Sequence, residues 1–426
     1  MINRKSPPEY SRVEDICFTE PEKCLFDNNI EVFTLNIGMQ DVVKIEFIFN
    51  AGMWEQDIPL VATACNSMLI EGTKKYTADE IAESIDFCGS YIETGINQDL
   101  ASVSLYTLNK HLAKTLPLVE EIIKNAVFPE KELDIYFNNN KQRFLVKNKK
   151  VKYIAKNKFS ESLFGKQHPY NTSLNISDFD NVKRKNIIDF YKKSYCSNNC
   201  KVIISGKAEK NCIKLVEKYF GGNDWSNKNF FSDKKNLVKT TNKKRIYENK
   251  PDAVQSAIRI GRLLFNRKHA GFQNMQILNM LFGGYFGSRL MSNIREDKGY
   301  TYGIGSGIVS LKNAGYFFIA TEVGVEFCEK TIDEIFREIK RLKDKKVGED
   351  ELKLVKNYML GTILREADGP FSLAEMYKSV LQYGLNFSYY KSFIENIKKA
   401  NPDLLLELAN KYFDEEKMKE IIVGKI

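Results

Sequence analysis

The chain has 426 residues, of which 43% are hydrophobic and 28% are charged, and its formal net charge is +9. This composition is that of a globular protein, and the length is sufficient for two or more domains, each with its own core. No run of residues approaches the roughly 18 to 20 apolar positions of a membrane-spanning helix, so we expect no membrane span. The basic residues form short clusters without interleaved aromatic residues, which argues against nucleic-acid binding.

The N-terminal residues "MINRKSPPEYSRVEDICF" contain no apolar stretch ahead of the Pro-Pro pair. No secretion signal is seen, and a cytoplasmic location is expected unless a leader has been removed. The eight cysteines are then expected to be reduced and mostly buried. Cys196 and Cys200 form the one close pair, and a metal site there would need two more ligands.

The first half of the chain alternates predicted strands with predicted helices. The segments "KIEFIFNAG" and "ASVSLYTL" alternate apolar and polar residues, and "CKVIISG" predicts another strand ahead of the helix "CIKLVEKYFGG". Strands separated by pairs of helices favour an antiparallel or mixed sheet with helices packed on one face.

The segment "PLVATACNSMLIEGT" between the first two of these strands predicts a helix. Pro59 is expected in its first turn, Asp57 is a candidate cap, and Gly72 is expected to end it. The apolar positions that recur on its faces are Val61, Ala64, Cys65, Met68 and Leu69.

Thr63, Asn66 and Ser67 stand at positions i, i+3 and i+4 of this predicted helix, so they share one face. Taken alone, the segment is an ordinary packed helix.

A polar segment rich in Lys and Asn, residues 221–250, reads as a linker between domains at 1–220 and 251–426. Each half contains an alternating strand, a long amphipathic helix, an acidic turn ending in Glu-Leu, and another helix. The two Glu-Leu pairs begin at Glu132 and Glu351. We therefore expect an α+β fold of two similar domains, each with a mostly antiparallel or mixed sheet and helices on one face.

The second half contains the motif-like segment "MQILNMLFGGYFGSRLMSNIREDKGYTYGIGSG". Its Gly-rich part lacks the spacing of a P-loop or a dinucleotide fingerprint, so we expect the glycines to allow close backbone packing. Without other information, Arg295 is interpreted as capping a helix end and Tyr302 as beginning a strand.

Together with "EGTKKYTADEI" and "FYKKSYCSNNCKVIISGKAEKNCIKLVEKYFGG", these segments resemble the pitrilysin/insulinase family of zinc peptidases, in its mitochondrial-processing-peptidase-like branch. The resemblance covers nearly the whole chain. In that family the first helix carries approximately G-x-A-H-x-x-E-H-M-x-F-x-G-T, an inverted zincin motif. Aligned on the Met and Gly-Thr that the chain retains, the first histidine falls on Thr63, the glutamate on Asn66 and the second histidine on Ser67.

The chemistry of that motif is therefore missing here. Zinc needs the two imidazoles, and the bound water needs the carboxylate as a base, whereas hydroxyls are poor zinc ligands and an amide is no base. The resemblance places a third ligand, a glutamate, in the helix after "FPEKEL", but residues 135–160, taken as that helix, contain no Asp or Glu. The remaining histidines, expected to be structural or at the surface, are His111, His168 and His269. No metal or other cofactor is expected in this chain.

The resemblance also implies a role for the second half. An Arg and a Tyr of active family members fall on Arg295 and Tyr302, with Tyr300 as an alternative for the Tyr. Arg295 would then bind a substrate carbonyl, and Tyr302 would donate a hydrogen bond to the oxyanion that forms on it.

The function implied is that of a non-catalytic, substrate-binding subunit of a heterodimeric zinc peptidase, whose homologous partner carries the zinc. Its substrate would be an extended peptide bound by strand addition to a sheet edge. One alternative is a catalytically inert structural or peptide-binding homo-oligomer of the same family. Another is an enzyme with a Ser or Cys nucleophile, but no such residue stands beside a recognisable His and acid pattern.

Overall fold

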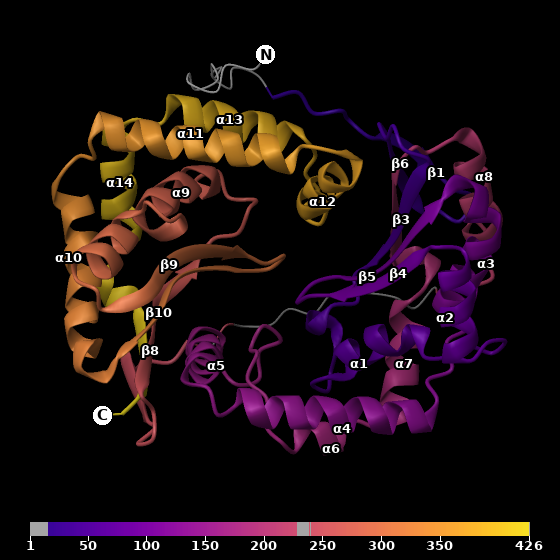
Figure 1. Ribbon diagram of the computed structural model, residues 1–426, viewed down its shortest axis with the longest axis horizontal. Helices are drawn as coiled ribbons and strands as arrows, with labels where there is room; N and C mark the ends of the chain where they lie inside the picture. The colour runs from indigo at the N-terminus through magenta and orange to yellow at the C-terminus, as the bar shows by residue number, and fades with distance from the viewer. Residues whose placement is uncertain (1–15, 228–237, 239, 426) are drawn as a thin grey trace, which may run out of the picture.

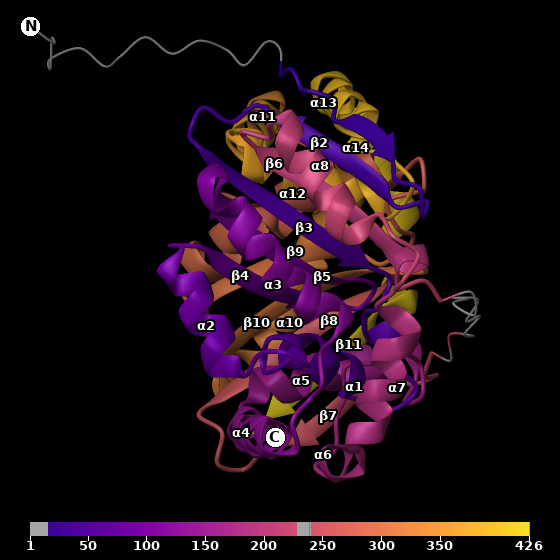
Figure 2. The same cartoon turned by 90° about the vertical axis from the view of Figure 1, so that its right-hand side faces the viewer.

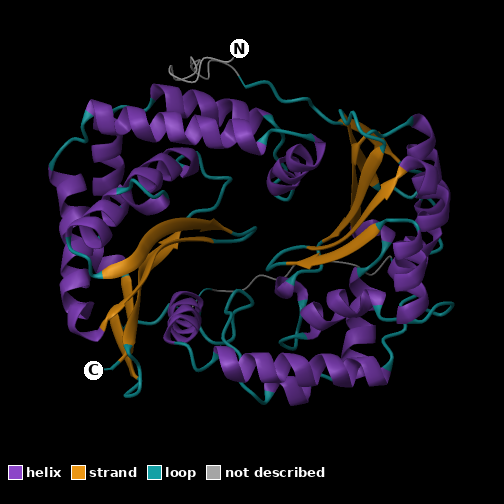
Figure 3. Cartoon of the chain, in the orientation of Figure 1, coloured by secondary structure: helices purple, strands orange, loops and turns teal. Residues whose placement is uncertain are grey.

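The computed structural model describes residues 16–227, 238 and 240–425 of the chain. Two sheets lie on opposite sides of the molecule, each with helices on its outer side (Figures 1 and 3). Figure 2 shows α2, α3 and α8 over the outer face of the first sheet. None of the described helices combines the length and apolarity needed to cross a bilayer.

The first sheet has the strand order β1-β2-β6-β3-β5-β4 and the second the order β7-β11-β8-β10-β9. The strands of the first are β1 (Glu22–Leu25), β2 (Glu31–Asn36), β3 (Val42–Phe49), β4 (Tyr91–Ile96), β5 (Ala101–Leu108) and β6 (Cys200–Gly206). Those of the second are β7 (Arg245–Asn249), β8 (Gln255–Leu264), β9 (Thr301–Ser310), β10 (Gly315–Gly324) and β11 (Lys419–Gly424).

Helices connect these strands in both halves. In the first half they are α1 (Val61–Ser67), α2 (Ala78–Phe87), α3 (Leu112–Lys124), α4 (Glu130–Lys147), α5 (Val151–Phe164), α6 (Asp178–Asn181), α7 (Arg184–Ser194) and α8 (Lys210–Phe220). In the second they are α9 (Phe272–Asn279), α10 (Cys328–Asp344), α11 (Glu349–Glu366), α12 (Pro370–Leu381), α13 (Ser388–Lys399) and α14 (Pro402–Tyr412). Short 3₁₀ turns are η1 (Met53–Glu55), η2 (Met68–Ile70), η3 (Asn109–His111), η4 (Ser197–Asn199), η7 (Val325–Phe327) and η8 (Glu415–Lys417), and π-helical turns are η5 (Met280–Gly284) and η6 (Met291–Asp297).

Local sequence explains many of these elements. Along β10, buried and half-buried residues alternate, so Phe317 and Ile319 enter the core under the outer helices while Tyr316 and Phe318 face the other side of the sheet. Helix α2 begins with a capping box, in which the Thr77 hydroxyl accepts from the Glu80 N–H and the Glu80 carboxylate accepts from the Thr77 N–H.

Apart from the additional strand β1 of the first sheet, the two sheets share one topology, which confirms the predicted pair of similar α+β domains. In each, one pair of strands is parallel, β2 with β6 and β7 with β11, and the other pairs are antiparallel. Helices α4 and α11 occupy equivalent places and both have 18 residues. The two Glu-Leu pairs noted in the sequence, at Glu132 and Glu351, lie at the same position of these helices.

Each half also supplies a helix to the other half's sheet. Helix α5 packs on β8 and β11 of the second sheet, and α12 packs on β2 and β6 of the first. Both lie on the inner sides of the sheets (Figure 1). The rings of Phe33 and Tyr377, on β2 and α12, are 5.3 Å apart. The halves are therefore held together by an exchange of helices.

The single helix predicted over residues 135–160 is wrong, because the structure has two. Helix α4 ends at Lys147 and α5 begins at Val151, with Lys150 in an extended conformation between them. The break lies at residues 148–150, an asparagine and two lysines, which offer no apolar side chain to hold a continuous helix against a core. It allows α5 to cross to the second sheet.

Part of the predicted linker, 221–250, is a strand, since β7 lies near its end and forms an edge of the second sheet. Residues 228–237 and 239 of that linker lie outside the described residues. The division into domains at this segment remains a prediction.

A cluster of charged residues joins β3 to α12. Lys44 and Glu46 on β3 are 3% and 2% exposed, and Glu375 and Lys378 approach them from α12. The Lys44 ammonium lies 2.5 Å from Glu375 and 3.3 Å from Glu46, and the Lys378 ammonium lies 2.8 Å from Glu46. Burial alone would lower the pKa of Lys44, but the charge of Glu46 and the hydrogen bond to Glu375 raise it.

Candidate functional site

Helix α1 carries the positions where the resemblance expects zinc ligands. It begins at Val61, preceded by Leu60 with a φ of 73°, so the prediction that Pro59 lies in its first turn and Asp57 caps it is wrong. The Ala62 N–H instead donates to the side-chain oxygen of Gln56, at 3.1 Å. The helix ends at Ser67, and a 3₁₀ turn, η2, follows it directly. Gly72, which was predicted to end the helix, lies beyond that turn.

The side chains on the zinc-motif face of α1 make ordinary structural contacts. Asn66 is 1% exposed, and its amide donates to the Tyr195 hydroxyl at 3.0 Å and to the Ser102 carbonyl at 3.3 Å. Ser67 is hydrogen-bonded to Tyr136 on α4. Thr63, on the same face, is half-buried.

The structure thus brings α1 and α4 together, as a zinc site requires, but with other groups. Zinc sites in proteins are built from imidazole, thiolate and carboxylate ligands. Hydroxyl, amide and phenol groups stand at this contact, so the family's zinc does not fit the residues present. Within the described residues, no group of three His, Cys, Asp or Glu side chains is arranged to hold a metal.

Arg295 and Tyr302 lie together in the second half. Arg295 is in the last turn of η6, and its guanidinium lies over the Phe286 ring, 4.5 Å from the centroid, and 5.9 Å from that of Tyr302. Tyr302 is 93% exposed near the start of β9. Arg295 makes no hydrogen bond or ion pair with another described residue, which leaves its five N–H groups available for a ligand.

Tyr300, the alternative to Tyr302, has a structural role. Its ring stacks on Phe327 with centroids 4.8 Å apart and packs against the core of the second half. Between the two tyrosines, Tyr302 is therefore the one that lies exposed beside Arg295.

The Gly-rich segment beside this pair allows close backbone packing, as the sequence predicts. A Cβ on Gly283 would lie 2.8 Å from the backbone nitrogen of Ser306 on β9. Further along the segment, Arg289 forms a bidentate ion pair with Glu351 on α11, with N–O distances of 2.7 and 2.8 Å. These contacts fix the loop that carries Phe286.

The three histidines make their contacts elsewhere in the structure. His168 is buried, and its Nδ1 accepts from the Tyr170 N–H at 3.1 Å. His269 is exposed and stacks on Phe265, and His111 is half-buried at the start of α3. Their contacts agree with the surface or structural roles expected.

The described cysteines are all free thiols. Cys196 and Cys200 are both buried, and burial raises the pKa of each. Neither is disposed to act as a thiolate nucleophile.

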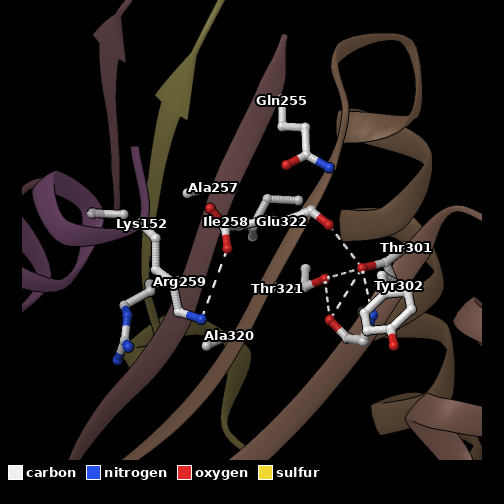
Figure 4. Close-up of a pocket in the computed structure, with 12 residues that line it drawn as sticks. Lys152, Gln255, Ala257, Ile258, Arg259, Thr301, Tyr302, Ala320, Thr321 and Glu322 are labelled. Carbon is white, nitrogen blue, oxygen red and sulfur yellow. Dashed lines mark hydrogen bonds and ion pairs between the residues drawn. The ribbon is translucent and has the colours of Figure 1, made fainter. Parts of the chain in front are cut away.

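A cavity of about 380 Å³ lies beside Tyr302, between α5 and the inner face of the second sheet (Figure 4). This cavity was not expected from the sequence. Its charged lining residues are Lys152 on α5, Arg259 on β8 and Glu322 on β10. The signal in the sequence would have been the glycines at alternate positions of β9, which leave one face of that strand without side chains.

Comparisons with known proteins match this chain to a domain described as inactive and to proteins named as zinc proteases. Residues 181–359 match the model described as "Peptidase M16 inactive domain". An "Uncharacterized zinc protease" of Rickettsia bellii is 24% identical over 409 residues, covering 93% of this chain and 95% of that relative. The chain is thus similar to M16 peptidases over nearly its whole length.

Other similar proteins have names that indicate lost activity. "Probable inactive metalloprotease YmfF" of Bacillus subtilis is 21% identical over 303 residues, covering 68% of this chain and 69% of that relative. A structure titled "peptidase M16 inactive domain from Pseudomonas fluorescens" has the same fold, with a TM-score of 0.87 and 20% identity over 95% of this chain and 98% of that one. This chain has Thr63, Asn66 and Ser67 at the positions of the family's zinc motif.

Proposed function

We propose that this chain is the substrate-binding subunit of a heterodimeric zinc peptidase. A homologous partner would supply the two histidines, the base glutamate and the zinc, while this chain supplies Arg295 and Tyr302. The observation that carries the proposal is a difference between the zinc-motif positions and the Arg/Tyr pair. The zinc-motif positions carry none of the family's ligands, yet Arg295 and Tyr302 lie side by side, and the Arg295 guanidinium makes no hydrogen bond or ion pair with another described residue.

In this role, Arg295 donates hydrogen bonds to a substrate carbonyl and Tyr302 donates from its hydroxyl to the oxygen that gains charge as the peptide bond is attacked. The Phe286 ring supports the guanidinium from one side through a cation–π contact. This contact limits the orientations of Arg295 before the substrate arrives, which favours catalysis by a preorganised donor.

The substrate is an extended peptide held by strand addition. Two exposed sheet edges support this binding mode: β4 ends the first sheet, and β9, which carries Tyr302, ends the second. Unpaired backbone N–H and C=O groups of an edge strand bind an extended peptide without regard to its sequence. Side-chain pockets next to the edge would then set the preference among peptides.

Reconstitution tests this proposal. The purified chain is mixed with a homologous chain from the same genome that carries an intact H-x-x-E-H motif, and cleavage of a quenched fluorescent peptide is followed. We expect cleavage by the mixture and none by this chain alone, with activity abolished when a motif histidine of the other chain is replaced by alanine. If the zinc-motif chain is equally active without this one, the proposal is wrong.

A further inference from the structure

The cavity beside Tyr302 owes its volume to small residues. Its walls are α5 on one side and strands β8, β9 and β10 on the other (Figure 4). Four lining residues have a methyl side chain or none: Ala155, Ala257, Gly303 and Ala320. A Cβ placed on Gly303 would meet nothing within 4 Å, so the space extends over the bare face of β9.

Unpaired positive charge borders this cavity. Arg259 makes no hydrogen bond or ion pair with another described residue, and its guanidinium lies 5.1 Å from the centre of the Phe318 ring. Lys156 lies one turn after Lys152 on α5, close enough to Arg259 for their charges to interact. Burial lowers the pKa of Arg259, and burial together with the charge of Arg259 lowers the pKa of Lys156.

The acidic residue in the lining does not neutralise this pair. Glu322 lies 3.8 Å from Lys152 and so is engaged by a different cation. Arg259 and Lys156 are therefore two like charges held together without a counter-charge among the described residues, an arrangement that costs free energy in the empty protein.

Other arginines of the second half have ion-pair or hydrogen-bond partners within the fold. Arg245 is 2.7 Å from Glu420, and Arg289 is bound by both oxygens of Glu351. Arg262 donates to the Tyr412 carbonyl, and Arg267 donates to Ser379. Arg259 stands apart from these residues because its partner is missing, which is the arrangement expected when a ligand supplies the partner.

We propose that this cavity binds a carboxylate of the peptide substrate, held by the Arg259 guanidinium with Lys156 beside it. The planar fork of an arginine matches a carboxylate in a bidentate contact, and a lysine adds charge without restricting the angle of approach. Tyr302 lines the same cavity, so a peptide at the proposed Arg/Tyr site extends into it. The inference rests on the proposed function and adds the substrate class: peptides with an acidic side chain or a free C-terminus close to the bond that is cut.

Calorimetric titration of the isolated chain with three short acetylated peptides tests the proposal. One peptide has internal glutamates and an amidated C-terminus, one has glutamines and a free C-terminus, and the third has glutamines and an amidated C-terminus. We expect at least one carboxylate peptide to bind on the order of 10- to 100-fold more tightly than the third, as a charged hydrogen-bonded pair allows. Preference for the first identifies an acidic side chain as the ligand, and preference for the second identifies the terminal carboxylate.

Variants link that preference to the cavity. Arg259→Gln and Lys156→Gln should each remove most of it, whereas Lys340→Gln, the same charge change on the outer helix α10, should leave it intact. If Arg259→Gln fails to fold, Lys156→Glu carries the test because the Lys156 side chain is partly open to solvent. Equal binding of all three peptides, or a preference that survives the Lys156 and Arg259 variants, overturns the proposal.

Failure of this inference is separable from failure of the proposed function. A chain that binds carboxylate peptides through Arg259 but never supports cleavage with a zinc-bearing partner would contradict the two-subunit function alone. A reconstituted peptidase that cleaves the acidic and neutral peptides equally would contradict the carboxylate site alone.

Discussion

Replacing Arg295 by alanine is expected to lower the turnover of the proposed two-subunit peptidase by about 10²-fold while the complex remains assembled. The guanidinium contacts only the rings of Phe286 and Tyr302 in the described part of the chain, so little of the fold depends on it. In the proposed mechanism, its loss removes a donor to the substrate carbonyl. The kcat of the variant complex, measured beside its elution volume on gel filtration, checks both parts of the expectation.

Two further variants make this result specific. Lys298→Ala removes an exposed charge at the end of the same turn and should leave kcat unchanged. Tyr302→Phe keeps the ring under the guanidinium but loses the hydroxyl, so it should also lower kcat. Full activity of the Arg295→Ala complex would exclude the role assigned to this residue, and dissociation of the complex would make its role one of assembly.

Replacing Lys44 by methionine is expected to lower the free energy of unfolding by about 3 kcal/mol, because breaking a buried ion pair leaves its partner charge without compensation. Methionine keeps the apolar stem but removes the ammonium that lies between Glu46 and Glu375. Glu46 would then remain buried with Lys378 as its one cation. Urea unfolding of the chain, compared at equal slopes, measures the loss.

The pH dependence of that loss follows from the direction of the Lys44 pKa. The folded pKa is raised, so the stabilisation is fully present below the ordinary lysine pKa of about 10.4 and is lost only as the pH rises through the folded value. The effect of Lys44→Met should therefore be constant between about pH 6 and pH 8.

Lys378→Met provides the control for the same cluster. Its side chain is 24% exposed, so water screens its charge and the loss should be clearly smaller. A loss below about 0.5 kcal/mol for Lys44→Met would show that the cluster does not hold α12 against the first sheet.

The sequence predicts those parts of the fold that depend on periodic or local residue patterns. The alternation in β10 and the Glu-Leu pairs that begin at Glu132 and Glu351 predict a duplicated α+β fold, and the structure places both pairs at the same position of equivalent helices. The Arg295–Tyr302 pair was also predicted, through the family resemblance. Its geometry depends on a turn, η6, and a strand, β9, that are neighbours in the chain.

What the sequence does not contain is information about long-range contacts. Leu60 has a left-handed backbone conformation, which in most proteins is found at glycine. Because the residue is a leucine, the sequence does not indicate this turn, and the predicted start of α1 is too early. Helices α5 and α12 each pack on the sheet of the other half. No local sequence pattern indicates on which sheet a helix packs. The cavity at Arg259 was missed for the same reason, since α5 approaches β8 from the other half of the chain.

The most direct test of the two-subunit claim is to capture the tagged chain from its own cells and to determine the composition and zinc content of the purified material. We predict a second chain of similar mass with an intact H-x-x-E-H motif, and about one zinc ion per pair of chains. A lone chain, or a homo-oligomer without zinc, would contradict the account and would favour an inert structural or peptide-binding assembly as the function of this chain.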